Sequence, residues 1–505
     1  MLFINPRINP KSQNALVNNF IVAAFPTGIG FLAGYLRERN SATIRIADES
    51  IQFLSDERLA DEIKKLETPK IVGISVLTIN CKRAFELAKK IKEIDQGVTV
   101  ILGGIHPTVM PEECLIRDGV DIVVRGEGEA TLSELYDLLK AKKSYEKVEG
   151  ISYKKDGKII HNPNRKLLSL KDIPSLPYDL FEKDMDTYRD FGIIMTSRGC
   201  PFSCIFCSQR AISGNVYRYM PNERILNDIK TLVDRYKQTK IWISEDNIGV
   251  DKQRLMGLCD EIVKSGYQKK AEFMAELRGD SVDYDILKKM KEANFTMISF
   301  GTETTSDRLL KVLNKGEKVE ANIRAIKMTK EVGIKVSTTF IFGIPTETRE
   351  ERLKSFRDAM ALPLDGVRFN TAIPYPGTKL YEIAKNEGNL KILDDWGNFN
   401  VQYYIMSDDI PYVPKGMDRR LLIYDTMMAN LSFYFRPRGI INMLKSPKTF
   451  GDAVTLPKNW YLSPTVIMNM ASLVFYIARR FAFVATRAFL VEIYNSAVPM
   501  FKVGA

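Results

Sequence analysis

Short apolar runs alternate with amphipathic segments of helix length along most of this 505-residue chain, and this alternation restricts the fold more than any other feature. Strand-like runs separated by helices of about 10–15 residues predict βαβ units and parallel sheets. Five such strands are expected within residues 1–140, at Met1–Asn5, Ala42–Ile46, Ile71–Val76, Val98–Leu102 and Asp121–Val124. They predict an α/β, Rossmann-like doubly wound parallel sheet, and such domains bind ligands outside the carboxyl ends of their strands.

The alternation returns after residue 190 and predicts six more strands, at Phe191–Ser197, Lys240–Ser244, Ala271–Glu276, Thr296–Phe300, Lys335–Phe342 and Gly366–Thr371. Six βα units are too few to close an eight-stranded barrel. They predict a partial (β/α)6 barrel of the TIM-like kind, with its chemistry at the carboxyl ends of the strands.

These patterns divide the chain into an N-terminal domain (1–140), a linker (141–190), the partial barrel (191–380) and a mostly helical, basic C-terminal region (381–505). Within the linker, a hairpin is expected with its turn at Asp156–Gly157.

Composition excludes several classes of protein. Lys and Arg number 73 against 62 Asp and Glu, and the resulting net charge of +11 is mild for this length, so no nucleic-acid partner is expected. Two histidines, His106 and His161, exclude a histidine-rich metal site. Six cysteines are too few for a disulfide scaffold and indicate a reducing compartment. Because the N-terminus does not resemble a signal peptide, a cytoplasmic protein is expected.

Three of the cysteines, Cys200, Cys204 and Cys207, have the spacing C-x3-C-x2-C and follow a predicted strand. Soft thiolates select iron–sulfur clusters or zinc, and structural zinc needs a fourth ligand, which no nearby residue offers. Three thiolates on a [4Fe–4S] cluster leave one iron open to another ligand. Three buried structural thiols, or a zinc site completed from elsewhere in the chain, remain as alternatives.

This cysteine loop, with Phe206 just before the last cysteine, resembles that of radical S-adenosylmethionine (SAM) enzymes. The resemblance implies that the open iron binds SAM. A reducing partner of the flavodoxin or ferredoxin type then supplies the electron that cleaves SAM to methionine and a 5′-deoxyadenosyl radical. By the same resemblance, SAM-binding residues follow the later strands: Glu245, Asp246, Arg278, Glu303 and Gly343.

The first domain resembles the cobalamin-binding domain of B12-dependent radical SAM enzymes through the segments FPTGIG (25–30), GGIHPT (103–108) and VRGEGE (124–129). The resemblance implies cobalamin contacts from residues near the strand ends: Gly28, Gly30, Ser75, Gly103, Gly104, His106, Gly126 and Gly128. No G-x-G-x-x-G segment supports a dinucleotide site. No D-x-H-x-x-G segment is present either, so cobalt is expected to lack a histidine ligand from below. A domain of this fold that has lost cobalamin is the alternative.

The C-terminal region contains an uncharged run, Trp460–Ala478, that polar residues interrupt. It suits a helical cap over the barrel, a basic helix lying on a membrane surface, or, less well, a membrane span. The segment Phe433–Arg438 resembles one in relatives that act on tetrapyrroles and hopanoid lipids. Peripheral membrane contact through this region therefore stays open.

Together the resemblances imply a B12-dependent radical SAM enzyme that methylates an unactivated carbon of a small or lipid-like substrate through methylcobalamin. An oxidative cyclase with the same cofactors, like anaerobic magnesium-protoporphyrin cyclase, is the main alternative. A non-catalytic protein that binds SAM and cobalamin is a further one.

Overall fold

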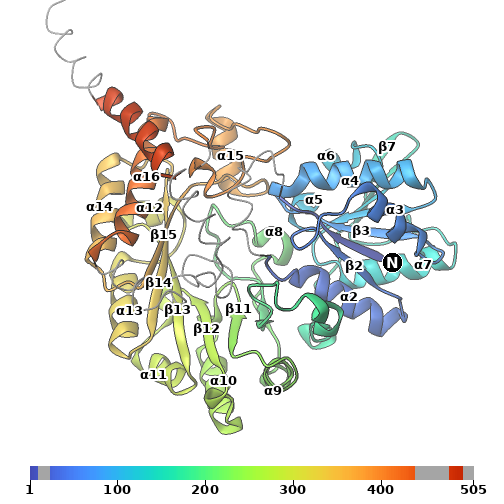
Figure 1. The fold of residues 1–505 in the computed structure, drawn as a ribbon, viewed down its shortest axis with the longest axis horizontal. Coiled ribbons are helices and arrows are strands. Elements are labelled where there is room, and N and C mark those ends of the chain that lie inside the picture. The colour runs from blue at the N-terminus through green and yellow to red at the C-terminus, as the bar shows by residue number, and fades with distance from the viewer. Residues whose placement is uncertain (9–22, 406, 438–476, 493–505) are drawn as a thin grey trace, which may run out of the picture.

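The computed structural model describes residues 1–8, 23–405, 407–437 and 477–492. Two α/β units lie side by side, and the C-terminal helices cover one end of the second unit (Figure 1). The expected combination of a doubly wound sheet, a partial barrel and a helical C-terminal region is confirmed.

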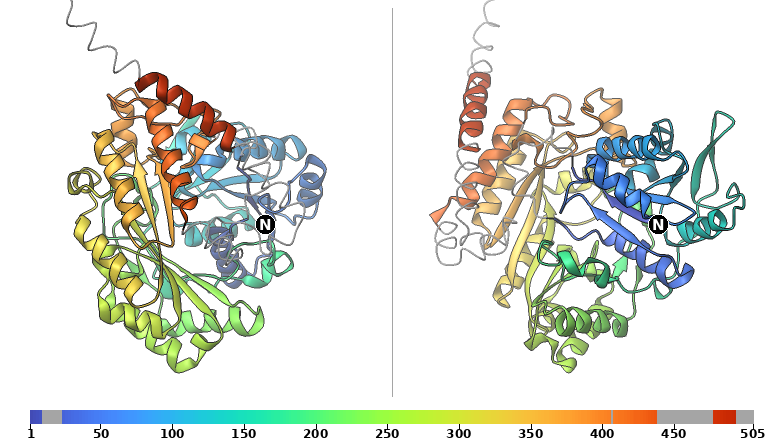
Figure 2. Two further views of the ribbon diagram at one scale, coloured as in Figure 1. Left: turned by 60° about the vertical axis from the view of Figure 1, so that its left-hand side comes forward. Right: turned by 45° about the vertical axis from the view of Figure 1, so that its right-hand side comes forward.

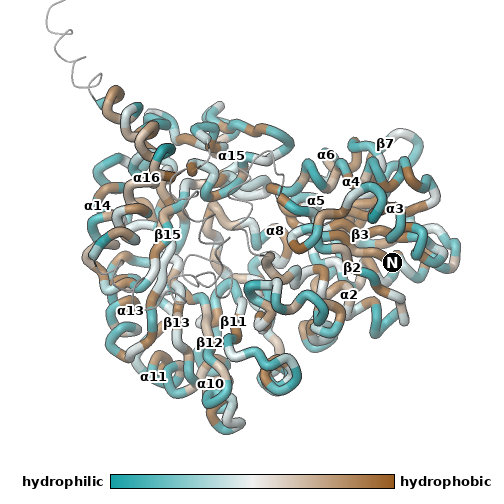
Figure 3. The backbone as a smooth tube through the Cα atoms, viewed as in Figure 1, coloured by the Kyte–Doolittle hydropathy of each residue, from teal (hydrophilic) through white to brown (hydrophobic). Residues whose placement is uncertain are grey.

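The first unit is a seven-stranded sheet with the order β2-β1-β3-β4-β5-β6-β7. The first five strands are parallel: β1 (Leu2–Asn5), β2 (Arg45–Asp48), β3 (Ile71–Ser75), β4 (Thr99–Gly103) and β5 (Ile122–Val124). Apart from the partly buried edge strand β2, their side chains are mostly apolar because helices cover both faces of the sheet. Figure 3 shows this hydrophobic layer between helices with hydrophilic outer surfaces.

Helices α2 (Thr27–Asn40) and α7 (Glu129–Lys140) pack on one face of this sheet, and α3 (Asp56–Lys64) and α4 (Cys81–Ile94) on the other. Strand β2 begins three residues later than expected. Ser41 ends α2 in the left-handed conformation, with φ 50°, and the amide of Ala42 still donates to the Leu36 carbonyl, so the chain becomes extended only later.

The expected hairpin forms, but it belongs to the first sheet. Strand β6 (Ile151–Lys155) pairs antiparallel with β5, and β7 (Lys158–His161) pairs with β6. Ile151 and Tyr153 are buried in the core of the N-terminal domain. The sheet of that domain therefore extends about twenty residues past the expected boundary at 140. The rest of the segment packs Leu176, Tyr178 and Phe181 into a core shared with the barrel.

The second unit is a six-stranded parallel sheet with the order β15-β14-β13-β12-β11-β8. Its strands are β8 (Ile193–Met195), β11 (Lys240–Ser244), β12 (Glu272–Leu277), β13 (Phe295–Glu303), β14 (Lys335–Phe342) and β15 (Gly366–Thr371). The helices of the outer, convex side are α9 (Asn222–Lys230), α10 (Lys252–Ser265), α11 (Tyr284–Glu292), α13 (Val319–Glu331) and α14 (Arg349–Ala361) (Figure 1). The short helix α12 (Asp307–Val312) follows β13 at the mouth of the barrel.

The C-terminal region adds α15 (Lys379–Asn386), α16 (Arg419–Tyr434) and a helix over residues 477–492 that packs beside α16 (Figure 2). Most of the uncharged run Trp460–Ala478 lies outside the described residues. Among the helices that the structure describes, none is both long and apolar enough to cross a bilayer.

Candidate active site

The carboxyl ends of the two parallel sheets face each other. A Cβ atom built on Gly126, after β5, would lie 3.9 Å from the carbonyl oxygen of Ile212 in α8 (Arg210–Ser213). A Cβ on Gly377, in the turn after β15, would lie 2.5 Å from Cγ1 of Val109 in α5 (Ile105–Val109). Parallel sheets bind ligands at this edge. Ligands of the two units would therefore share one space.

Buried charges join these edges. Arg198 donates to Oε1 of Glu129 at 2.6 Å and lies 3.4 Å from Oε2 of Glu127. Arg218 donates to Glu127 as well, and so does the hydroxyl of Ser213. None of these four charged side chains is more than 14% exposed. We call Glu127, Glu129, Arg198 and Arg218 the interdomain clamp.

The cysteine loop begins directly after Arg198, where β9 (Ser197–Arg198) pairs with β10 (Arg218–Tyr219). Gly199 has φ 86°, and a Cβ there would lie 2.2 Å from the Val216 carbonyl oxygen, so only glycine fits. Ile205 anchors the loop: its amide donates to Leu313, and its carbonyl accepts from Leu380, each at 2.9 Å. The loop is thus held between α12 and α15 at the mouth of the barrel.

Cys200, Cys204 and Cys207 are all free thiols. Each lies within electrostatic range of another, and enclosure by protein raises the pKa of all three, that of Cys207 to about 11. The positive charges of Arg278 and Lys315 act in the opposite direction on Cys200 and Cys204 and favour their thiolates.

Within the described ranges, no three Cys, His, Asp or Glu side chains are arranged so that they could bind one metal ion. This holds for the three cysteines of the loop as well. The donor set nevertheless fits an iron–sulfur cluster: three soft thiols share one short loop beside two cations. The other cysteines, Cys81, Cys114 and Cys259, are buried on helices elsewhere and offer no fourth ligand.

The acidic pair that ends β11 divides into two roles. Glu245 is buried, and its oxygens accept from Ser197 at 2.6 Å, from Tyr217 at 3.1 Å and from Arg254 at 3.0 Å. Asp246 instead accepts from the amide of Gly199, and burial next to Glu245 raises the pKa of Asp246 to about 6. Of the two, only Asp246 is directed at the cysteine loop.

Arg278 follows β12 as expected and contacts the cysteine loop. Its guanidinium lies 3.6 Å from the ring centre of Phe202, and it pairs with Asp280 at 2.9 Å. Glu303, at the end of β13, has φ 62° and pairs with Lys315 at 2.9 Å. These expected residues therefore meet at the cysteine loop.

The sequence analysis missed Lys315 and Glu317. The ammonium of Lys315 is buried, donates to the Gly301 carbonyl at 2.6 Å and lies 3.7 Å from Glu317. Oε2 of Glu317 is buried without a hydrogen-bond donor. Both residues come from an Asn-Lys-Gly-Glu segment whose composition is typical of an exposed turn, so no sequence signal marks them.

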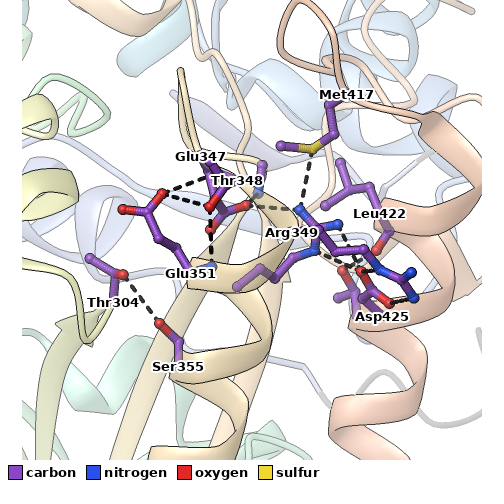
Figure 4. A network of polar contacts seen from close by, with 12 residues as sticks. Thr304, Glu347, Thr348, Arg349, Glu351, Ser355, Met417, Leu422 and Asp425 are labelled. Atoms are coloured by element: carbon purple, nitrogen blue, oxygen red, sulfur yellow. Dashed lines mark hydrogen bonds and ion pairs between the residues drawn. The ribbon is translucent and has the colours of Figure 1, made fainter.

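The turn after β14 is fixed by charges from the C-terminal region (Figure 4). Gly343 has φ 81°, and its amide donates to Glu347 at 2.7 Å. Arg352 on α14 joins Glu347, at 3.3 Å, to Asp425 on α16, at 2.7 Å. Arg349 pairs with the other oxygen of Asp425 at 3.1 Å. Burial raises the pKa of Glu347 to about 7.

Phe206 is half-buried between two small apolar clusters, one built on Leu380 and the other on Leu309 and Ile344. It anchors the end of the cysteine loop against both sides of the barrel mouth.

Glycines leave open space at the carboxyl edge of the first sheet. Among the residues that the structure describes, a Cβ on Gly28 would meet no atom within 4 Å, and one on Gly103 or Gly126 only atoms at 3.9 Å or beyond. Gly104 has φ 108°, which favours glycine. An edge that the described side chains leave unfilled at these glycines, beside Ser75 at the end of β3, fits a bulky ligand such as cobalamin.

Three further expected cobalamin contacts have close neighbours within the protein. Gly30 packs under Leu176, whose Cδ2 would be 2.8 Å from an added Cβ, and Gly128 packs against Leu32. His106 is fully buried: its Nε2 lies 3.6 Å from Glu113, and its ring meets Trp396 edge-on. The imidazole therefore joins the N-terminal domain to the C-terminal region rather than facing the open edge.

Comparison with known proteins finds two family matches, one in each α/β unit. Residues 194–359 match the radical SAM superfamily, and residues 14–136 match the B12 binding domain. An uncharacterized methyltransferase of Pyrococcus horikoshii is 33% identical over 441 residues, covering 86% of this chain and 92% of that protein. The anaerobic magnesium-protoporphyrin IX monomethyl ester cyclase of Cereibacter sphaeroides is 26% identical over 423 residues, covering 81% of this chain and 67% of the cyclase.

Among solved structures, the radical SAM methyltransferase TsrM from Kitasatospora setae, with cobalamin and a [4Fe–4S] cluster bound, superposes with a TM-score of 0.68. It is 15% identical and covers 86% of this chain and 91% of its own, so it supports the fold. The family's cofactors are a [4Fe–4S] cluster, SAM and cobalamin, and its chemistry needs a reductant. The chain belongs to the cobalamin-dependent radical SAM methyltransferase family.

Proposed function

We propose that this enzyme methylates an unactivated carbon of a small or lipid-like substrate held between its two α/β units. The observation that supports this most is the meeting of the two ligand-binding edges, which brings the cysteine loop and the glycine edge side by side. An sp3 carbon has no lone pair to take up a methyl group directly, so its methylation needs a radical step.

In this proposal Cys200, Cys204 and Cys207 hold the cluster, and the loop's neighbours bind SAM: Phe206, Asp246, Arg278, Glu303 and Gly343. When bound, the cluster and SAM supply one-electron chemistry, and cobalamin supplies the methyl group.

The chain's own residues hold this site in place. The buried pair of Glu245 and Arg254 fixes the strand end that carries Asp246. Lys315 compensates the charge of Glu303 and keeps it from repelling thiolate sulfur. SAM is a zwitterion with an added sulfonium, and a site with both acidic and basic side chains can bind both of its charged ends.

For cobalamin we propose contacts from Gly28, Ser75, Gly103, Gly104 and Gly126, with no imidazole bound to cobalt from below. His106 is buried in the protein interior, and His161 lies on β7, where it pairs with Glu112 at 3.0 Å. These are the chain's two histidines. The electron paramagnetic resonance spectrum of the Co(II) form should not change when the protein is made with nitrogen-15-labelled histidine, whereas an altered nitrogen splitting would contradict the proposal.

A cyclase outcome is the second candidate, because the cyclase relative aligns over most of this chain. Anaerobically reconstituted enzyme should convert SAM and substrate to 5′-deoxyadenosine, S-adenosylhomocysteine and a product heavier by one CH2 unit. A product of unchanged carbon count would instead establish ring closure. Absence of 5′-deoxyadenosine would contradict radical chemistry altogether.

A flavodoxin- or ferredoxin-type protein is our proposed electron donor. We also propose a peripheral membrane contact through the helix over residues 477–492, whose outer face exposes Phe483, Phe489 and Leu490. Sedimentation with anionic lipid vesicles should be lost when these three residues are replaced by serine; equal sedimentation of that variant would contradict the contact.

A further inference from the structure

The inner face of the barrel sheet carries two charged side chains that no part of the site described above uses. On β15, Val367 and Phe369 are buried in the core beneath the outer helices, and the Phe369 ring lies 5.2 Å from that of Phe340. Side chains alternate between the faces of a strand. Arg368 and Asn370 therefore project from the opposite, concave face.

The same alternation holds on β12. Phe273, Ala275 and Leu277 belong to the core beneath the helices, so Met274 and Glu276 project into the concave side. Glu276 and Arg368 are both exposed to solvent. Yet protein encloses Glu276 closely enough to raise its pKa, against the opposing effect of the Arg368 charge. Both side chains thus lie on the concave face of the barrel sheet.

Glu276 and Arg368 attract each other through space but do not touch. Within the described ranges, Glu276 and Arg368 make no hydrogen bond and no ion pair. The two strands are three strand spacings apart, about 14 Å along the sheet, so the two side chains act on each other through space without forming an ion pair. Two ionised groups on this face are costly once a bound molecule displaces their water, unless that molecule pairs with them.

Along the strands of the barrel, Glu276 and Arg368 lie at about the same level as the cysteine loop. Arg368 pairs in register with Thr339, and Thr339 with Gly301, whose carbonyl accepts from Lys315. Glu276 lies within electrostatic range of Asp246, which contacts the loop. A molecule bound between Glu276 and Arg368 would therefore lie beside the SAM site proposed above.

A second observation on β15 supports a ligand here. Oδ1 of Asn370 is buried and has no hydrogen-bond partner. Trp242 and Met274 contribute apolar surface on the same concave side, where each is half-buried. Small-molecule sites combine such apolar walls with a few unpaired polar groups.

We infer that the substrate of this enzyme carries a carboxylate or phosphate that pairs with Arg368 and a hydroxyl or amino group that donates to Glu276. This inference rests on the proposed function and narrows it. A purely hydrocarbon substrate would displace water from both charges without offering them a hydrogen bond. An acidic substrate with a donor group would instead pair with Arg368 and donate to Glu276. The planar guanidinium can bind either oxyanion through two hydrogen bonds.

The test uses full-length, anaerobically reconstituted enzyme and SAM with an isotope-labelled methyl group. An extract of cells that make the protein is separated by anion exchange into a retained, acidic pool and a neutral pool, and each is supplied as substrate. Labelled product is expected from the retained pool. Phosphatase treatment of that pool then distinguishes a phosphate from a carboxylate, since only a phosphorylated substrate is lost.

Three variants accompany the wild type. Arg368→Ala should raise the half-saturating amount of the retained pool by about tenfold or more, as expected for loss of a hydrogen bond to a charged group. Arg368→Lys should recover part of that loss, which a mere folding defect would not allow. Arg357→Ala, at an exposed arginine on α14, serves as the matched control and should equal the wild type.

Absence of labelled product from the retained pool overturns the inference, whatever the neutral pool shows, and so does equal saturation by Arg368→Ala and wild type. Measurement of 5′-deoxyadenosine in the same tubes distinguishes a wrong substrate class from a wrong function. If it forms, the radical function stands and only the substrate class is wrong; if it does not form in any tube, the proposed function itself fails.

Discussion

At the residue scale, the site depends on side chains that keep space open as much as on side chains that bind. The cysteine spacing is predictable because it is local in sequence. The charged residues around the loop are not predictable in this way. Lys315 and Glu303 come from different segments, and they pair because the end of β13 and the segment after α12 lie next to each other. Likewise, the sequence predicts that Glu245 binds SAM, whereas in the structure its carboxylate pairs with Arg254 on α10.

Gly28 offers a test of the open edge. Alanine at this helical position meets no atom of the described residues within 4 Å and should keep or slightly raise stability, by up to about 1 kcal/mol. The same methyl group would enter the space that we assign to cobalamin and should weaken its binding by about tenfold, because overpacking costs about 1–3 kcal/mol. Titration of the variant with cobalamin, followed by absorbance, measures the change.

The control for this experiment is Gly257→Ala on α10, where an added Cβ makes only an ordinary contact with Asn222. It should bind cobalamin like the wild type. Equal cobalamin affinity of Gly28→Ala and Gly257→Ala would remove Gly28 from the proposed site.

At the scale of elements, the strands of the barrel are the part that sequence predicts best. Lys240–Ser244, Lys335–Phe342 and Gly366–Thr371 form as expected, because their apolar alternation and their flanking helices agree. The hairpin at Asp156–Gly157 was predicted as an element but not as an edge of the first sheet. Its pairing with β5 depends on a contact between strands separated by a whole helix, which no local pattern encodes.

The helix α16 carries a second test, since Asp425 is fully buried between Arg349 and Arg352. Replacing it by asparagine leaves two arginines short of their counter-charge, and removal of one partner of a buried pair costs about 3–5 kcal/mol. The midpoint of thermal unfolding of the barrel should therefore fall clearly. Because Arg352 also holds Glu347, affinity for SAM should decrease as well.

Glu350→Gln is the matched control, because its pair with Arg357 is exposed and such pairs contribute at most about 1 kcal/mol. If Asp425→Asn unfolds at the same midpoint as Glu350→Gln, the buried network does not stabilise the turn after β14.

At the scale of the whole molecule, the enzyme works only if two separately folded edges are held at a fixed distance. The presence of two domains with these cofactors follows from sequence motifs. Their mutual position does not, because it depends on the interdomain clamp and on shared cores such as the one that Trp396 joins to the N-terminal domain. Glu127 and Glu129 alternate with glycines in the segment after β5. No local sequence pattern predicts that they pair with Arg198 and Arg218.

The clamp predicts a particular defect. Glu127→Gln weakens the hold on Arg198 and Arg218 and loosens the spacing of the two edges. SAM cleavage should continue while methyl transfer fails more often, so the ratio of 5′-deoxyadenosine to methylated product should rise about tenfold or more, since misplacement by about 1 Å costs up to about a hundredfold in rate.

Glu134→Gln, which alters a surface pair with Arg165, should leave this ratio unchanged. A ratio in Glu127→Gln equal to that of the control would show that the clamp does not set the distance between the cofactors.

The central claim is that three thiolates of one loop hold a cluster with an open iron. Its most direct test is the metal content of anaerobically reconstituted full-length enzyme, compared with the variant Cys204→Ala. The account predicts about four irons and four sulfides per wild-type chain, together with a change in the cluster's electron paramagnetic resonance signal on addition of SAM, and loss of both in the variant. Zinc in place of iron, or iron and sulfide that persist in Cys204→Ala, would contradict it.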